Sequence, residues 1–204
     1  MMNILATYNV SRETIKTLKN YEALVLEWNE RFNLISKSSV DFIWERHILD
    51  SLQLYEFLDD KAKSLYDFGS GAGFPAIVLA IVAKEKNPDL KITLIESIKK
   101  KAIFLNEVKN KLELNIEIIN DRIENIDKTN IDIITSRAMA SLDKLLEYSK
   151  PFCSKKTQLI FPKGIKWKEE LLEAQKKWNF NYEVINSKTD ESGHIFKISN
   201  LRRK

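Results

Sequence analysis

The chain of 204 residues is 44% hydrophobic and 30% charged, a composition typical of a globular protein with one substantial core and unlike that of disordered or fibrous chains. Its single cysteine, Cys153, excludes an internal disulfide, and the start lacks the pattern of a secretory signal, so we expect a cytoplasmic protein. The longest apolar run, residues 74–83, is far shorter than the roughly 20 residues of a membrane-spanning helix, so we expect no membrane partner.

The formal net charge is only +4, but residues 137–204 contain 15 lysines and arginines against 8 aspartates and glutamates. A basic surface attracts polyanions such as nucleic acids by counterion release. Basic surfaces also promote solubility, so charge alone leaves both interpretations open.

The first part of the chain is predicted to be helical, because neither glycine nor proline occurs before residue 69. Apolar side chains spaced three or four residues apart predict a helix that begins after a cap at Ser11 and runs through Phe32. A second helix is expected over about residues 38–58. We therefore predict a helical N-terminal cap over residues 1–62 and one further domain over residues 63–204.

From residue 65 onward, short strand-like runs alternate with helical ones, as in a mostly parallel sheet covered on both faces. The last two strand-like runs are joined only by residues 187–193, a link too short for a parallel crossover, so they should form an antiparallel hairpin. The predicted fold class is therefore α/β with a C-terminal hairpin. Strands are expected at residues 65–69, 91–96, 116–120, 131–136, 157–162, 181–186 and 194–199, and helices after residue 74 and at residues 98–112, 142–148 and 167–178.

A glycine-rich loop follows the first predicted strand. Three of the five glycines fall in the run from Asp67 to Pro75. Glycine allows positive φ and close approach of a ligand to the main chain, and a helix start presents free N–H groups, so a ligand is expected here. Glu96 ends the second strand, where a carboxylate can accept hydrogen bonds from both ribose hydroxyls of an adenosine ligand.

Two other interpretations of this loop stay open. Phe74 stands where the dinucleotide-binding fingerprint requires a third glycine, which disfavours a nicotinamide-dependent oxidoreductase without excluding it. The plainer alternative is a tight turn over residues 69–73 beside a solvated carboxylate at Glu96.

The run from Asp67 to Pro75, taken with Ile95-Glu96-Ser97, resembles the cofactor loop of class I S-adenosylmethionine-dependent methyltransferases, which have a Rossmann-like fold. The chain as a whole resembles one family among them, the glucose-inhibited division protein B family, over nearly its full length. The segments that carry this resemblance are Trp28-Asn29-x-Arg31-Phe32-Asn33-Leu34, Glu45-Arg46-His47-Ile48-Leu49-Asp50-Ser51, the glycine loop, Arg122-Ile123-Glu124, Ser136-Arg137-Ala138 and Lys163-Gly164.

The resemblance implies a transferase that moves a methyl group from S-adenosylmethionine to N7 of a guanine in 16S ribosomal RNA, at nucleotide 527. Its partner would be this RNA within the small ribosomal subunit or an assembly intermediate, and we expect a monomer without a metal. The cofactor-binding residues implied are Gly69, Ser70, Gly71 and Phe74 beside the methionine part, Glu96 at the ribose, Ile123 and Glu124 at the adenine, and Arg137 facing the incoming base.

Guanine N7 carries a free lone pair, so methylation there needs no general base, and none is predicted. Arg137 closes an apolar strand at the carboxyl end of the sheet, which makes it the best candidate for positioning the base. The candidates for RNA binding are Arg31, Arg46, His47 and Lys163.

These residues also have plainer interpretations. His47 can be a packing residue, Lys163 an ordinary surface lysine, and Ile123 a core residue between a solvated charge pair. A non-catalytic RNA-binding or ribosome-assembly module, and a methyltransferase acting on a protein or small molecule, are the remaining alternatives. The basic second half of the chain favours RNA as the substrate, and transfer of a labelled methyl group to RNA would separate the enzyme from the non-catalytic module.

Overall fold

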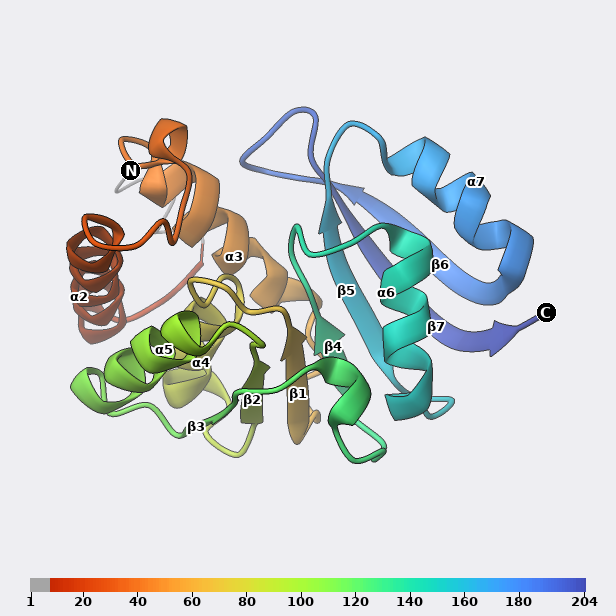
Figure 1. Cartoon of the computed structure of the whole chain (residues 1–204), viewed down its shortest axis with the longest axis horizontal. Coiled ribbons are helices and arrows are strands. Elements are labelled where there is room, and N and C mark those ends of the chain that lie inside the picture. Colours follow the sequence, from red (N-terminus) through yellow and green to blue (C-terminus); the bar gives the residue numbers. More distant parts are fainter. Residues whose placement is uncertain (1–7) are drawn as a thin grey trace.

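The computed structural model describes residues 8–204. Seven strands form one sheet in the order β3-β2-β1-β4-β5-β7-β6 (Figure 1). Within the group β1 to β5, every pair of neighbouring strands is parallel. Strand β7 is antiparallel to both of its neighbours, β5 and β6. The predicted α/β class and C-terminal hairpin are therefore confirmed. The strands are β1 (Ser64–Phe68), β2 (Lys91–Ile95), β3 (Ile116–Ile119), β4 (Ile133–Thr135), β5 (Gln158–Lys163), β6 (Trp178–Asn186) and β7 (His194–Arg203).

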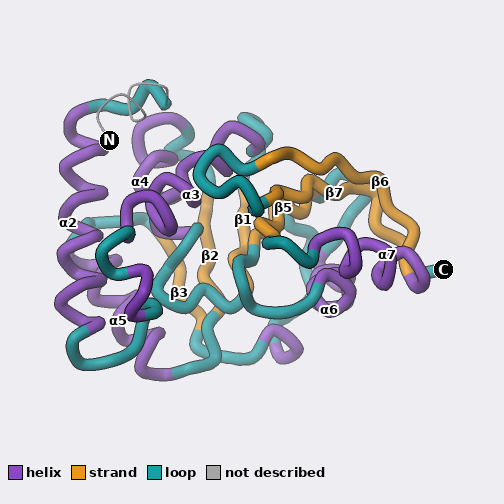
Figure 2. The backbone as a smooth tube through the Cα atoms, turned by 90° about the horizontal axis from the view of Figure 1, so that it is seen from above, coloured by secondary structure: helices purple, strands orange, loops and turns teal. Residues whose placement is uncertain are grey.

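The two faces of the sheet bury two separate hydrophobic clusters, because successive strand residues point to opposite faces. In β4, Ile133 belongs to one cluster and Ile134 to the other. Helices α4 (Ala76–Lys86) and α5 (Lys99–Lys111) belong to the first cluster, and α6 (Leu142–Ser149) and α7 (Trp167–Lys177) to the second, so the sheet is covered on both sides (Figure 2).

Helix α2 (Arg12–Asn29) begins as predicted. The Ser11 hydroxyl accepts a hydrogen bond from the backbone N–H of Thr14 at 3.1 Å and so caps the helix. The prediction that the helix runs through Phe32 is wrong, because the Asn29 side chain accepts the N–H groups of Leu34 and Ile35 and turns the chain.

The prediction of one regular second helix is also wrong. A 3-10 turn over Lys37–Ser39 is followed by a π-helix over Trp44–Leu49, by α3 (Asp50–Leu52), and by a second 3-10 segment over Gln53–Phe57. The Ser39 hydroxyl donates to the Ser36 carbonyl at 2.8 Å, which competes with regular helical hydrogen bonding there. Short π-helical segments often lie at functional sites, and this one carries Arg46 and His47.

The N-terminal helices pack against the sheet-covering helices. Helix α4 is apolar and buried over residues 76–83 on all sides, because α2 and α3 cover the surface that the sheet leaves free. α2 and α3 therefore share the first hydrophobic cluster with the sheet; the division at residue 62 stays a prediction. No helix among residues 8–204 is long and apolar enough to cross a membrane.

Candidate functional site

A cleft of about 1240 Å³ opens at the carboxyl ends of the parallel strands. Its walls come from the segments that follow β1, β2, β3 and β4, which is where open α/β sheets bind ligands. The π-helix and the loop between β6 and β7 complete the cleft from the other side. Segments far apart in the sequence therefore form one site.

The glycine loop follows β1 and requires its glycines. Gly69 has φ of +63°, a conformation that other residues rarely adopt, and a Cβ there would lie 2.6 Å from the sulfur of Met139. The hydroxyl of Tyr21, on α2, donates to the carbonyl of Ala72 at 2.5 Å and fixes the loop from outside the sheet. The predicted ligand loop is thus rigid.

Glu96 joins the glycine loop to the next helix. Its carboxylate is only 4% exposed, and its two oxygens accept hydrogen bonds from the backbone N–H groups of Gly71 at 2.8 Å and Ile98 at 2.7 Å. Each carboxylate oxygen has a second acceptor site, so Glu96 keeps the capacity to accept from ribose hydroxyls. The alternative of a solvated strand end does not agree with this burial.

The predicted cofactor residues all line the cleft. Gly69, Ser70, Gly71 and Phe74 lie on one side, Glu96 at the centre, and Ile123 and Glu124 beyond it, with Ile123 buried and Glu124 exposed. This sequence of a main-chain loop, a carboxylate and an apolar edge fits the methionine, ribose and adenine parts of S-adenosylmethionine. Among residues 8–204, no group of three or more histidine, cysteine or acidic side chains comes together in a way that could hold a metal ion.

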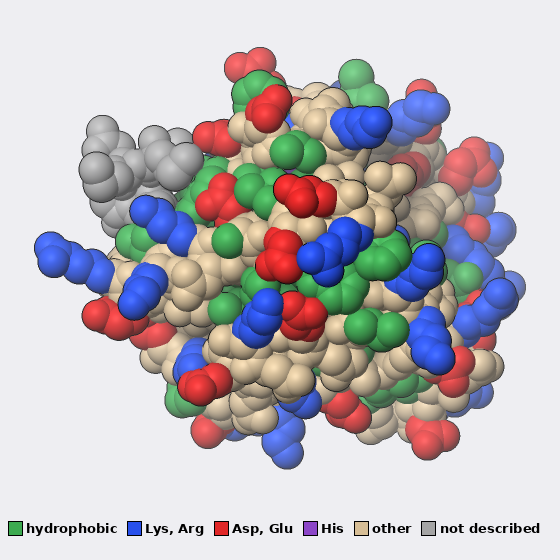
Figure 3. Space-filling view, turned by 60° about the vertical axis from the view of Figure 1, so that its left-hand side comes forward, with side chains coloured by type: hydrophobic (Ala, Val, Ile, Leu, Met, Phe, Trp, Pro, Cys, Tyr) green, Lys and Arg blue, Asp and Glu red, His purple; other side chains and the backbone are tan. Residues whose placement is uncertain are grey.

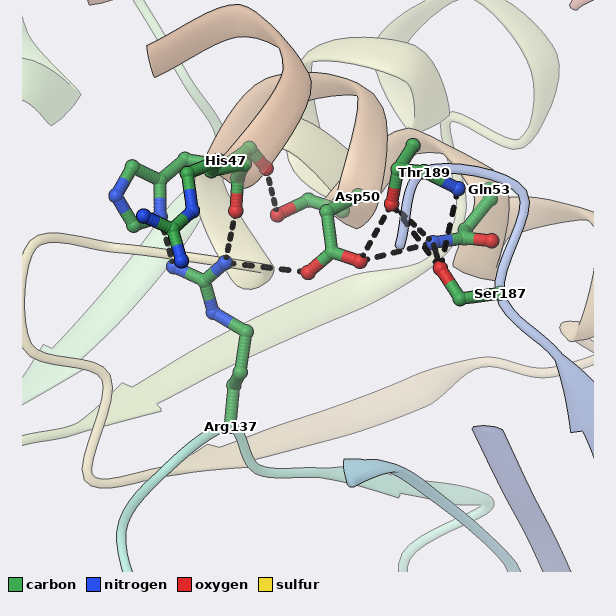
Figure 4. A network of polar contacts seen from close by, with 8 residues as sticks. His47, Asp50, Gln53, Arg137, Ser187 and Thr189 are labelled. Carbon is green, nitrogen blue, oxygen red and sulfur yellow. Dashed lines mark hydrogen bonds and ion pairs between the residues drawn. The ribbon is translucent and has the colours of Figure 1, made fainter. Parts of the chain in front are cut away.

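Arg137 lies at the centre of a polar network that reaches the N-terminal segment (Figure 4). Its Nη1 donates to the carbonyl of Arg46 at 3.0 Å and forms an ion pair with Asp50 at 3.2 Å, and its Nη2 lies 2.7 Å from Nδ1 of His47. The guanidinium also lies over the ring of Phe74, 5.2 Å from its centroid. Arg137 therefore connects the end of β4 to the π-helix across the cleft.

His47 is held in one neutral tautomer. Burial, together with the charges of Arg137 and Arg46, lowers its pKa to about 3. Because a guanidinium can only donate, the Nδ1 atom of His47 accepts from Arg137 and the proton resides on Nε2. The imidazole ring stacks on Phe74 at a centroid distance of 4.9 Å, as expected of a packing residue. His47 also lines the cleft, so it belongs to the candidate site as well.

Asp67, the residue before the glycine loop's turn, is fully buried. Its Oδ1 accepts a hydrogen bond from Thr135 at 2.7 Å, while its Oδ2 has no partner among the described residues. Burial raises the pKa of Asp67 to about 6, so the carboxyl group titrates near neutral pH.

Of the three remaining residues predicted to bind RNA, only Arg46 lines the cleft, whereas Arg31 and Lys163 lie outside it. Arg46 lines the cleft beside His47, whereas Arg31 lies outside it and pairs with Glu27 at 3.8 Å on the surface. Lys163 is neither in the cleft nor on the open surface, since its side chain is 8% exposed and its ammonium pairs with Glu170 at 2.7 Å and donates to the carbonyl of Ala140 at 2.7 Å. It lines a smaller adjoining cavity of about 510 Å³.

On the face shown in Figure 3, basic and acidic side chains are interspersed around apolar ones.

Cys153 is partly buried, and burial raises its pKa to about 11, so it is held as a neutral thiol.

The model of one protein family, described as rRNA small subunit methyltransferase G, matches residues 14–195. The chain belongs to the rRNA small subunit methyltransferase G family. A ribosomal RNA small subunit methyltransferase G from Orientia tsutsugamushi is 43% identical over 94% of this chain and 93% of its own length. One from Ruegeria pomeroyi is 38% identical over 97% and 96%.

Solved structures place this family member in the class I methyltransferase fold. A SAM-dependent methyltransferase from Aquifex aeolicus superimposes with a TM-score of 0.60 at 16% identity, covering 88% of this chain and 97% of its own. An O-methyltransferase from Bacillus cereus in complex with SAH superimposes with a TM-score of 0.60 at 14% identity, covering 89% and 91%. The fold predicted from the glycine loop is therefore confirmed.

Sequence reasoning missed several residues that form the site of this family member. Asp50 lies in the segment 45–51 that carries the family resemblance, but its pairing with Arg137 spans 87 positions and has no local signal. Asp121 lies two residues after the end of β3, so its place near the carboxyl end of a strand could have identified it. Thr189 and Asp190 lie in the hairpin loop, which only the tertiary fold brings to the cleft.

Proposed function

We propose that this chain transfers a methyl group from S-adenosylmethionine to N7 of a guanine in 16S ribosomal RNA, with nucleotide 527 as its target. We further propose that it acts as a cytoplasmic monomer on the small ribosomal subunit or an assembly intermediate. The observation that carries the proposal is the cleft itself, in which the Glu96 carboxylate and the glycine loop lie opposite Arg137 and the neutral imidazole of His47. The relatives named for small-subunit rRNA methylation support the same substrate class.

S-adenosylmethionine, when bound, supplies an electrophilic methyl group attached to a positively charged sulfur. Transfer to guanine N7 would break the carbon–sulfur bond with its electron pair left on sulfur, so the purine ring would gain the positive charge and no proton would leave N7. A site for this reaction works by proximity, orientation and field, and it needs no ionisable base.

The residues of the cleft supply these functions in the proposal. The main chain of the glycine loop and Glu96 bind and orient the cofactor, and Ile123 provides an apolar surface for its adenine. Because its pKa is lowered to about 3, His47 stays neutral above about pH 5. A neutral imidazole adds no second positive charge beside the purine ring, which becomes positively charged in the reaction. Arg137 orients the base from the end of β4.

The proposal assigns RNA contacts to Arg31, Arg46 and His47. The position of Lys163 supports an indirect role, because its contacts with Glu170 and the Ala140 carbonyl hold the segment that follows Arg137. Lys163 would then shape the base-binding side of the cleft and would not contact a phosphate.

The test incubates purified protein with methyl-labelled S-adenosylmethionine and 30S subunits from a strain that lacks the enzyme. Methylated guanine at N7 is mapped by chemical cleavage of the extracted 16S ribosomal RNA. Label at one guanine, at nucleotide 527, is the expected result. Cofactor binding without label in RNA would refute the proposed substrate, and label that resists cleavage at N7-methylguanine would refute the proposed atom.

A further inference from the structure

A second cavity of about 510 Å³ adjoins the cofactor cleft. The two cavities share six lining residues, so they meet at one junction: Asp50, Arg137, Ala138, Met139, Ala140 and Asp190. The volume lies within the range of about 300–1,000 Å³ typical of small-molecule sites. A methyl group that passes from a cofactor in the cleft to an acceptor in the second cavity must cross this junction.

Asp190 lines this junction from the hairpin loop, where its side chain is exposed. Its Oδ1 accepts hydrogen bonds from both the backbone N–H and the hydroxyl of Ser192, each at 2.8 Å. The charge of Arg46 and the backbone N–H of Gly193 also act on this carboxylate, and both lower its pKa. The carboxylate of Asp190 is thus anchored through one oxygen, and its exposed side chain can meet a ligand.

The loop that carries Asp190 is anchored to the N-terminal segment, although loops between hairpin strands are ordinarily mobile. Gln53 is fully buried, and its amide donates to the hydroxyls of Ser187 and Thr189 while its carbonyl accepts the N–H of Lys188 at 2.9 Å (Figure 4). Thr189 also donates to Asp50 at 3.0 Å. These contacts, which cross more than 130 positions in sequence, hold the residue next to Asp190 in place.

Guanine is the base that a fixed carboxylate selects. Its Watson–Crick edge presents two adjacent donors, N1–H and the 2-amino group, whereas adenine presents an acceptor at N1. RNA methyltransferases reach a base by taking it out of the stack and bonding that edge. A contact at the Watson–Crick edge also leaves N7, on the other edge, free to meet the methyl group.

Resting on the proposed methylation of guanine N7, we propose that the second cavity receives the target guanine and that the Asp190 carboxylate accepts hydrogen bonds from its N1–H and 2-amino groups. Asp190 is then a specificity-determining residue. Arg137, whose guanidinium contacts Asp50 and His47, lines the same junction. The hydrogen bonds from Ser192, which lower the pKa of Asp190, keep the carboxylate ionised for this task.

The test compares 30S particles whose 16S ribosomal RNA carries either guanine or inosine at the target position, since inosine lacks only the 2-amino group. Wild-type protein should lose about 5- to 100-fold in kcat/KM on the inosine particle, the range expected for one specific base contact. Asp190→Asn keeps the acceptor that Ser192 needs but presents a donor to guanine. This variant should be at least about 100-fold slower on guanine, with a further loss on inosine of less than about 3-fold.

Two measurements separate recognition from structure. Affinity of Asp190→Asn for S-adenosylmethionine, by calorimetry, should equal that of wild type, and a drop would place Asp190 in the cofactor site instead. Glu191→Gln, which alters the neighbouring carboxylate, should keep the wild-type ratio of guanine to inosine rates, because Glu191 lines only the cofactor cleft. An unchanged ratio in Asp190→Asn, or equal wild-type rates on both particles, would overturn the inference, whereas no labelling of guanine by wild type would instead overturn the proposed function.

Discussion

Replacing Arg137 with alanine tests the network that connects β4 to the π-helix. The substitution removes the hydrogen bond to the Arg46 carbonyl, the ion pair with Asp50 and the bond to His47. Breaking a fully buried pair costs about 3–5 kcal/mol and an exposed pair about 0–1 kcal/mol. Because the Arg137 and Asp50 side chains are 17% and 18% exposed, we expect the free energy of unfolding to fall by about 2–3 kcal/mol.

A domain stability of about 5–15 kcal/mol leaves this variant folded, so its activity can be measured. Methyl transfer to 30S subunits should fall by at least about 100-fold, the effect of a misplacement of about 1 Å between the reacting groups once Arg137 no longer fixes the end of β4 against the π-helix. Urea denaturation and single-turnover labelling measure the two quantities. Arg202→Ala removes an exposed arginine at the end of β7 and should change stability by less than about 0.5 kcal/mol.

The same variant has a pH signature. The pKa of His47 in the folded protein lies below its unfolded value of about 6.5, so the unfolded chain binds the extra proton first and stability falls as pH drops through about 6.5 toward 3. The charge of Arg137 contributes to the lowering of the His47 pKa, so the Arg137→Ala variant should lose less stability than wild type as the pH drops. The destabilisation by Arg137→Ala should therefore be smaller at pH 5 than at pH 8. Equal values at both pH values, or wild-type labelling, would refute the network described here.

Three further outcomes are expected. Gly69→Ala should weaken S-adenosylmethionine binding at least about 10-fold in calorimetry, because of its positive φ and the clash with Met139, while Gly164→Ala, with open space around its Cβ, should not. Asp67→Asn should raise stability by about 2–3 kcal/mol at pH 8 but not at pH 4, since the raised pKa costs the folded wild type stability increasingly from about pH 4 and in full above about pH 6. Lys163→Ala should lower the melting temperature yet leave the salt dependence of RNA binding unchanged; a slope reduced by about one would instead show a phosphate contact.

Much of the fold could be predicted because it depends on local patterns. Strand alternation, the short link over residues 187–193 and the glycine spacing each identify an element without knowledge of its neighbours. Glu96 could be placed in the site because the carboxyl ends of parallel strands meet at one edge. The breaks in the second helix could not be predicted, because hydrogen bonds among neighbouring serines and the packing of Trp44 and Ile48 decide them.

The buried polar pairings mark the limit of sequence reasoning. Lysine is ordinarily a surface residue, and only the fold shows that Lys163, whose side chain is 8% exposed, pairs with Glu170 on α7. Likewise Gln53 has no motif, yet its fully buried amide connects the N-terminal segment to the hairpin loop. Such pairs join segments more than 100 residues apart or on different elements, so no periodicity in the sequence encodes them.

These pairings also decide how the N-terminal segment contributes to the site. Tyr21 bonds the glycine loop, Asp50 pairs with Arg137, and Gln53 holds the loop of Asp190, so each helical part contacts a different wall of the cleft. A segment that served only to bind RNA would have no need of buried bonds to the cofactor loop. The helical segment therefore holds the glycine loop, Arg137 and the hairpin loop in fixed positions relative to one another, so a change in this segment is expected to alter the geometry of the whole cleft.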